Sequence, residues 1–148
     1  LWTKFGLTGG LSGLVLAYLG LTIPLNVWML SIFIKEIPFE LEEAAAIDGC
    51  SYMRILWGIV VPLIKPGISV TSVFTFRTAW NEFLLAIILS NRSTRTLPAA
   101  VSLMISDLGI NWGQIMAMAT IIAIPAFIVT FACSKNLITG MTAGAVKG

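Results

Sequence analysis

The chain has 148 residues, of which 57% are hydrophobic and only 11% are charged, and its mean hydropathy is +0.95. Soluble domains carry roughly a quarter charged residues, so this composition excludes an average soluble domain and indicates a membrane protein. The net charge of +2 is too small and too scattered to neutralise a row of phosphates, which argues against a nucleic-acid partner.

The first apolar segment is long enough to cross a bilayer. No charged residue occurs between Phe5 and Ile34, and we predict a spanning helix over about residues 10–35. Pro24 removes a backbone hydrogen bond in its middle, which predicts a kink. The chain begins without Met, and this segment lacks the charged region and cleavage site of a signal peptide. We therefore expect the C-terminal part of a longer protein.

Half of the charged residues of the chain lie in the next segment, residues 35–66. An alanine-rich run, 44–46, favours a helix that stops at Gly49, and Ser51 is suited to cap a second helix. Two short helices would form a compact knuckle over residues 40–58, and the small alanines would let another protein approach closely. Segment 35–66 and the C-terminal tail together contain five Lys and Arg residues, whereas the loops on the opposite side of the membrane contain three. The positive-inside rule therefore places loop 36–66 in the cytoplasm.

The second spanning helix is expected over about residues 67–90 and contains Arg77 and Glu82. Ionisable groups at such depth face a protein interior or a watery cavity. Arg77 and Asn81 share a helix face, whereas Glu82 lies about 140° around the helix from Arg77, so we expect Glu82 to meet another helix. For Asn81 and Glu82, pathway lining and structural interhelical bonding are both open. For Arg77 a structural role is favoured.

Residues 91–109 are expected to form an external loop, whose stretch 97–105 is apolar enough to enter the protein. A third spanning helix is expected over about 110–134, with Pro125 as a second kink site. Lys135 then marks the return to the cytoplasm, and residues 136–148 form a tail rich in Gly and Thr.

Several of these segments resemble one family, the membrane subunits of ABC importers. The order Glu43-Ala44-Ala45, Gly49, Ile59, Val61, Pro62 is similar to its EAA loop, with Val61 where the family usually has Leu. The chain also resembles the carbohydrate-uptake, maltose-permease-like branch of this family, at Pro38, Leu41-Glu42-Glu43, Ile47-Asp48-Gly49, Trp80-Asn81-Glu82-Phe83, Leu97-Pro98 and the ending 142–148. The resemblance runs from about residue 7 to the last residue. It implies an all-α polytopic fold in which residues 1–148 are part of a type I importer transmembrane domain, since the family usually has about six spanning helices.

The resemblance also implies a function and its partners. The chain would be the permease subunit of a binding-protein-dependent importer for sugars or oligosaccharides in a bacterial or archaeal inner membrane. Its partners would be ABC ATPase subunits, a second permease, an extracytoplasmic solute-binding protein, lipid and the sugar. The implied ATPase-coupling residues are Glu43 as charged contact, Ala44, Ala45, Gly49 as corner, Tyr52, Met53 and Pro62, with Gly144 and Lys147 in a tail that reaches the ATPase. The pathway candidates are Trp80, Asn81 and Glu82, which offer the hydrogen-bonding and aromatic groups that a sugar needs.

No catalytic residue is expected. No Gly-x-x-x-x-Gly-Lys-Ser/Thr stretch occurs, so ATP hydrolysis is assigned to a separate subunit. The chain has no His, and Cys50 and Cys133 lie far apart, so we expect neither a metal site nor a cofactor. Two alternatives stay open: an ATP-independent secondary transporter or channel that uses Arg77 and Glu82, and an importer permease for another small solute such as a polyamine. A membrane-embedded enzyme is disfavoured because no pair of catalytic groups converges.

Overall fold

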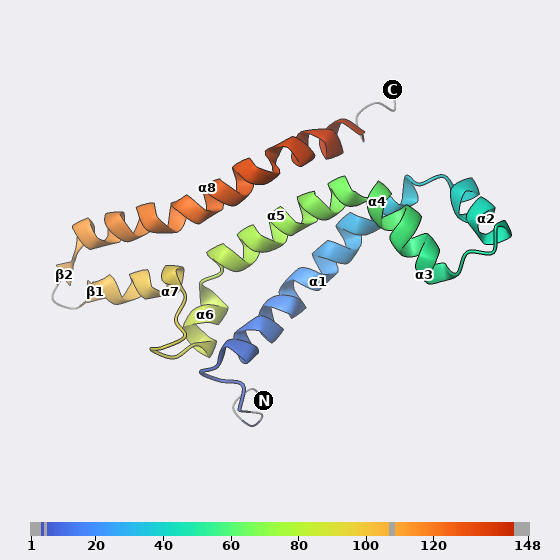
Figure 1. Ribbon diagram of the computed structural model, residues 1–148. Coiled ribbons are helices and arrows are strands. Elements are labelled where there is room, and N and C mark those ends of the chain that lie inside the picture. The colour runs from blue at the N-terminus through green and yellow to red at the C-terminus, as the bar shows by residue number, and fades with distance from the viewer. Residues whose placement is uncertain (1–3, 5, 107–108, 144–148) are drawn as a thin grey trace. The chain divides into compact units, whose positions relative to one another are not determined.

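The computed structural model describes residues 4, 6–106 and 109–143, and of residues 103, 106 and 134–143 it describes the backbone alone. The described residues are mostly helical, with one short antiparallel pairing of Ile105 with Ile110 and Ser106 with Gly109. In chain order the elements are α1 (Leu11–Lys35), α2 (Phe39–Ile47), α3 (Tyr52–Ile55), the π-helical η1 (Leu56–Val60), α4 (Val61–Leu63), α5 (Lys65–Asn81), α6 (Leu84–Leu89), α7 (Leu97–Val101), the 3₁₀-helical η2 (Ser102–Met104), β1 (Ile105–Ser106), β2 (Gly109–Ile110) and α8 (Trp112–Ala143) (Figure 1).

By length and composition, two described helices can cross a membrane. They are Leu11–Lys35 and Trp112–Cys133, and a third crossing results if the bent pair Tyr52–Leu63 and Lys65–Asn81 counts as one span. Helices suit the bilayer because they satisfy their backbone polar groups internally. The all-α, polytopic fold class is therefore confirmed.

Two helix boundaries differ from those expected. The helix expected over 67–90 is interrupted, because α5 ends at Asn81 and α6 begins only at Leu84. The carboxylate of Glu82 accepts hydrogen bonds from backbone N–H groups ahead of it, and such local bonds compete with a continuous helix. α8 continues through Ala143, beyond the expected end at 134, since extending an existing helix is far easier than starting one.

The chain divides into two compact units, of which the first comprises Leu1–Ile23 and Thr75–Phe131. Its buried apolar core joins α1, α6 and α7 through Leu14, Ala86, Leu89 and Ala99. Ala86 and Ala99 are fully buried, and their small size lets the short helices approach closely. Of the apolar stretch 97–105 in the expected external loop, Ala99 packs inside this unit, whereas Leu97 and Ile105 stay exposed.

The second unit comprises Pro24–Phe74 and Ala132–Gly148. Its core is formed by Ala45, Ile55, Val60 and Ile64, against which Phe33, Ile37, Cys50, Ile59 and Ile68 pack. Gly67 of α5 lies against Phe33 of α1, and a Cβ built at Gly67 would lie 2.4 Å from the Phe33 ring. The two helices come this close because position 67 carries no side chain.

Candidate functional site

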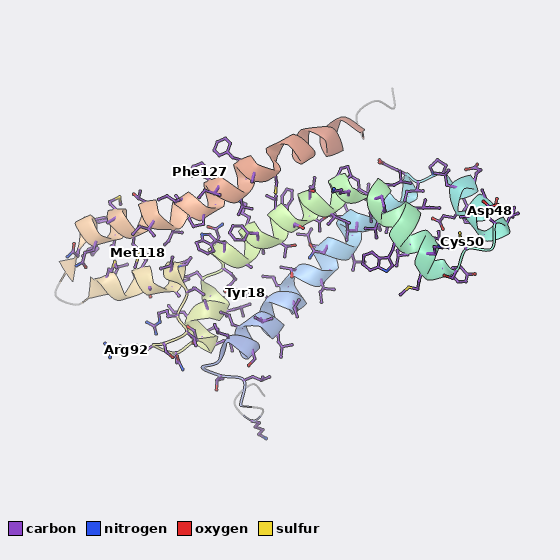
Figure 2. All side chains as sticks on the ribbon, in the orientation of Figure 1. Tyr18, Asp48, Cys50, Arg92, Met118 and Phe127 are labelled. Carbon is purple, nitrogen blue, oxygen red and sulfur yellow. The ribbon has the colours of Figure 1, made fainter. Side chains whose placement is uncertain are left out.

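The knuckle, residues 40–58, is built around the end of α2. Cys50 N–H donates to the Ala45 carbonyl and Gly49 N–H to the Ala46 carbonyl, both at 3.0 Å. These two bonds define a Schellman motif, in which the residue after the helix takes a left-handed conformation. Gly49 has φ +77°, as that motif requires. The expected end of the first helix at Gly49 is confirmed, and Figure 2 labels Asp48 and Cys50 on either side of it.

The alanines of the knuckle divide between its inside and its outside. Ala45 is buried in the core of the second unit, whereas Ala44 and Ala46 are exposed. Consecutive helical residues point about 100° apart, so three adjacent alanines cannot all lie on one bare side. The exposed Ala44 and Ala46 lie about 160° apart around α2, so each permits a close approach on its own side of the helix, and Ala45 stabilises the knuckle from within.

The outer surface of the knuckle is apolar where α3 begins. Tyr52 is 92% exposed and Met53 66% exposed. Glu43 is exposed on α2. Other large apolar side chains exposed on the knuckle are Leu41, Ile47, Leu56 and Trp57. Exposed aromatic and apolar side chains in the most charged segment of the chain are typical of a surface that another protein covers.

The exit from the knuckle combines a π-helical turn with a sharp bend. Ser51 occupies the N-cap position of α3, although its side chain makes no capping bond. The Val61 N–H donates to the Leu56 carbonyl, a π-helical bond. Pro62 follows and has no N–H, so the Gly58 carbonyl lacks its α-helical donor. The axis then bends by 74° between Tyr52–Leu63 and Lys65–Asn81.

A second cluster of candidate residues lies at the α5–α6 joint, residues 80–83. Glu82 Oε1 accepts the Leu85 N–H at 2.9 Å, and Oε2 accepts the Ala86 N–H at 3.0 Å and the Tyr18 hydroxyl at 3.2 Å. The two amides belong to the first turn of α6, where N–H groups have no partner within the helix. Glu82 thus meets another helix, α1, as expected from its place in the predicted helix over 67–90.

The other two pathway candidates also hold backbone groups. Trp80 donates its indole N–H to the Ile122 carbonyl of α8 at 3.0 Å, and its ring stacks on Phe76 at a centroid distance of 5.5 Å. Asn81 Nδ2 donates to the Arg77 carbonyl at 2.9 Å, on the helix face that the two residues share. Of these three consecutive side chains, Trp80 therefore binds α8, Asn81 binds α5 itself, and Glu82 binds both α6 and α1.

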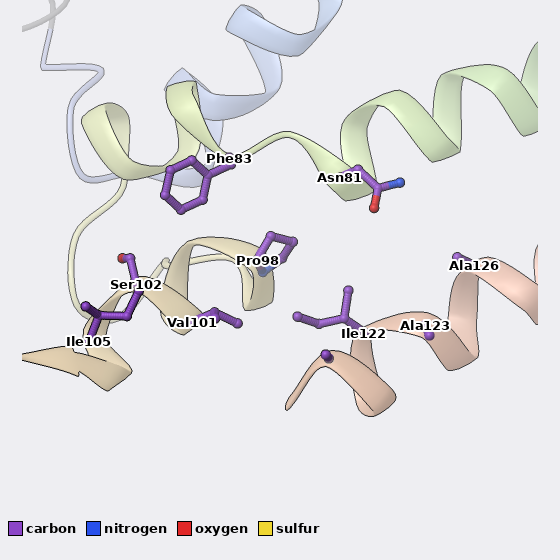
Figure 3. A pocket seen from close by; sticks show the side chains of 10 residues that line it. Asn81, Phe83, Pro98, Val101, Ser102, Ile105, Ile122, Ala123 and Ala126 are labelled. Atoms are coloured by element: carbon purple, nitrogen blue, oxygen red, sulfur yellow. The ribbon is translucent and has the colours of Figure 1, made fainter. Parts of the chain in front are cut away.

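Asn81 also lines a cavity of about 520 Å³ within the first unit. Figure 3 shows side chains from the joint, from α7 and its continuation, and from α8 around this hollow. Two of its lining side chains are polar, Asn81 and Ser102, and the Ser102 hydroxyl donates to the Ala99 carbonyl at 2.7 Å. The full lining is Asn81, Phe83, Pro98, Val101, Ser102, Ile105, Ala119, Ile122, Ala123 and Ala126.

Some sequence predictions fall outside these clusters. Gly144 and Lys147 lie outside the described residues. Across residues 4, 6–106 and 109–143, no group of three or more His, Cys, Asp and Glu side chains could hold a metal ion. Sequence reasoning missed Tyr18, because it stands in an uncharged apolar run and nothing in the spacing connects it with Glu82, 64 positions away.

The described features define a polytopic helical membrane protein whose charged segment folds as a pair of short helices between apolar ones. The chain belongs to the family described as "Binding-protein-dependent transport system inner membrane component", because the sequence model of that family matches residues 1–142.

Named relatives are similar along almost the whole chain. The diacetylchitobiose uptake system permease protein DasC of Streptomyces coelicolor is 37% identical over 136 residues, which are 91% of this chain and 49% of DasC. The trehalose/maltose transport system permease protein MalG of Thermococcus litoralis is 35% identical over 147 residues, 98% of this chain and 53% of MalG. The probable starch degradation products permease protein AmyC of Thermoanaerobacterium thermosulfurigenes is 39% identical over 137 residues, 92% of this chain and 50% of AmyC. The chain therefore spans about half the length of these relatives.

Proposed function

We propose that the chain is part of the permease subunit of a binding-protein-dependent ABC importer for sugars or oligosaccharides. The observation that carries this function is the knuckle, a helix end fixed by the Schellman bonds of Gly49 and Cys50 and followed by the exposed Tyr52 and Met53. A separate ATPase subunit hydrolyses ATP. Closure of two such ATPases moves the knuckle as a lever and switches the spanning helices between inward- and outward-open states.

Some residues of the knuckle contact the ATPase directly, and others support the contact surface from within. Glu43 provides the charged contact with the ATPase, Tyr52 and Met53 provide apolar contacts, and Ala44 permits close approach. Gly49 forms the corner between the two short helices. Ala45 acts from the core, and Pro62 sets the exit toward α5, so both support the contact surface.

The remaining partners follow from the family and from the distribution of charge and apolar surface. Loop 36–66 and the C-terminus lie on the cytoplasmic side of a bacterial or archaeal inner membrane, where Gly144 and Lys147 extend toward the ATPase. The apolar side chains that α8 exposes, among them Ile124, Phe127 and Ile128, contact lipid and a second permease subunit. An extracytoplasmic solute-binding protein delivers the substrate.

The substrate class is inferred from the names of the relatives and from the joint. DasC, MalG and AmyC are named for diacetylchitobiose, trehalose/maltose and starch degradation products. Of the three pathway candidates, Asn81 has the strongest support, because it lines the cavity. Trp80 and Glu82 hold neighbouring elements through hydrogen bonds, so their contribution to a pathway comes through the shape of the joint.

Uptake into proteoliposomes tests the function. The full-length permease is reconstituted with its partner permease, the ATPase and the binding protein, and uptake of radiolabelled maltose, trehalose and putrescine is measured. Sugar uptake that requires ATP and the ATPase is expected. Uptake driven by an ion gradient without the ATPase would instead establish a secondary transporter, and ATP-dependent uptake of putrescine alone would establish a polyamine permease.

A charge reversal tests the docking surface. Glu43→Lys should reduce co-purification of the ATPase, because it replaces attraction by repulsion at a protein interface, and an acidic substitution in the facing groove of the ATPase should partly restore it. Glu36→Lys makes the same charge change at an exposed position before α2 and serves as the control. Equal recovery of the ATPase with both variants would show that Glu43 is not an anchor.

A further inference from the structure

We propose that Tyr18 is a positioning residue of the transport cycle: through Glu82, its hydroxyl fixes α1 to the α5–α6 joint, so that α1 and α6 move as one body. This role rests on the proposed function, which supplies the transport cycle. The contacts that support it all lie within the first unit. Figure 2 labels Tyr18 on α1.

The carboxylate that Tyr18 binds is itself held by backbone groups. Both oxygens of Glu82 accept N–H groups of α6, Leu85 at 2.9 Å and Ala86 at 3.0 Å. Glu82 is half-buried, so its carboxylate depends largely on partners within the protein for its hydrogen bonds. The orientation of the carboxylate is therefore set by α6, and the Tyr18 bond at 3.2 Å connects α1 to the first turn of α6.

The joint needs such a connection because its backbone continuity is weak. The Glu82 N–H reaches the Ala79 carbonyl at 3.4 Å, a long bond of the 3₁₀ type. On the far side of the break, the bond from the Ile87 N–H to the Phe83 carbonyl, at 3.0 Å, is the first helical bond of α6. A two-residue interruption between helices can absorb large changes of φ and ψ and so act as a hinge. Side-chain bonds to Glu82 restrain that hinge.

Apolar packing alone does not fix the geometry of this contact. Leu14, one turn before Tyr18 on α1, packs with Ala86 and Leu89 of α6. Burial of apolar surface is non-directional, so it keeps the helices together but permits rotation and sliding. The Tyr18 hydroxyl adds a directional bond at one position. Its removal should therefore leave the fold intact and loosen the joint.

Two isosteric variants separate this bond from the loss of any buried hydroxyl. Tyr18→Phe removes only the hydroxyl that binds Glu82. Thr22→Val, one turn further along α1, removes a buried hydroxyl whose bond stays within the helix, to the Tyr18 carbonyl at 2.8 Å. Both variants are made in the full importer complex.

Hydrogen exchange gives the first readout and requires no substrate. In Tyr18→Phe, exchange of peptides covering α6 should be about tenfold faster, which corresponds to about 1.4 kcal/mol and is the size expected for a bond to a charged group. In Thr22→Val, exchange of α6 should not change. Equal exchange in Tyr18→Phe and the wild type would overturn the role of the hydroxyl.

Coupled transport gives the second readout. Tyr18→Phe should raise the ATP hydrolysed per sugar imported about tenfold, with normal complex yield and melting temperature, whereas Thr22→Val should not. If Tyr18 acts through Glu82, adding Tyr18→Phe to Glu82→Gln should cause little further loss. Independent effects in the double variant, or loss of the complex in Tyr18→Phe, would overturn the assignment. If the wild-type complex carries no sugar, the proposed function fails, and hydrogen exchange alone decides whether Tyr18 restrains the joint.

Discussion

Replacing Gly49 with alanine should loosen the knuckle even though nothing obstructs the added methyl group. A Cβ built at Gly49 has no atom within 4 Å, so crowding does not enter. The penalty comes from φ +77°, where the Cβ of an L-residue approaches the following carbonyl oxygen, at about 1–2 kcal/mol. Asparagine tolerates this conformation better than alanine despite its larger side chain.

This conformational penalty predicts an order of variants that does not follow side-chain size. A penalty of 1–2 kcal/mol shifts a local two-state equilibrium about 5–30-fold. ATP-driven uptake should therefore fall from wild type to Gly49→Asn and further to Gly49→Ala, and Gly49→Leu should uncouple ATP hydrolysis from uptake. Membrane insertion should not change, because the turn lies outside the spanning helices.

The assay combines coupled uptake with hydrogen exchange over residues 44–50, where the Schellman bonds protect the Gly49 and Cys50 amides. Gly58→Ala is the matched control, since a Cβ there also has no atom within 4 Å and Gly58 has no positive φ. If Gly49→Ala behaves like Gly58→Ala, the left-handed corner is not needed. If Gly49→Asn is worse than Gly49→Ala, the knuckle requires a small surface there and not a particular φ.

Three further substitutions test contacts within the units. Gly67→Ala places a Cβ 2.4 Å from the Phe33 ring and should destabilise the protein by about 1–3 kcal/mol, which Phe33→Leu should partly restore in thermal melts. Trp80→Phe keeps an aromatic ring but loses the 3.0 Å bond to the Ile122 carbonyl; an unchanged melting temperature would contradict a stabilising contribution of about 1 kcal/mol. Asn81→Ala should alter the rates for two different sugars without lowering the melting temperature, and lost stability with unchanged selectivity would end its pathway assignment.

The sequence alone was sufficient where structure depends on near neighbours. An uncharged run of this length predicts α1 at Leu11–Lys35, and the alanine run before Gly49 predicts where α2 ends. Capping, helix propensity and hydrophobic length act over a few residues, so the order of residues determines them. The motif around Glu43 and Pro62 likewise indicated the family.

The tertiary structure decided how residues far apart in the chain share their hydrogen bonds. Composition predicted that Glu82 would meet another helix but not which residue it would meet, and the folded chain brings the Tyr18 hydroxyl, 64 positions away, to its carboxylate. The burial of Ala45, while Ala44 and Ala46 stay exposed, likewise depends on which helix face meets the core. Local preferences do not fix these choices, because each polar group in an apolar environment takes whichever partner the folded chain brings within reach.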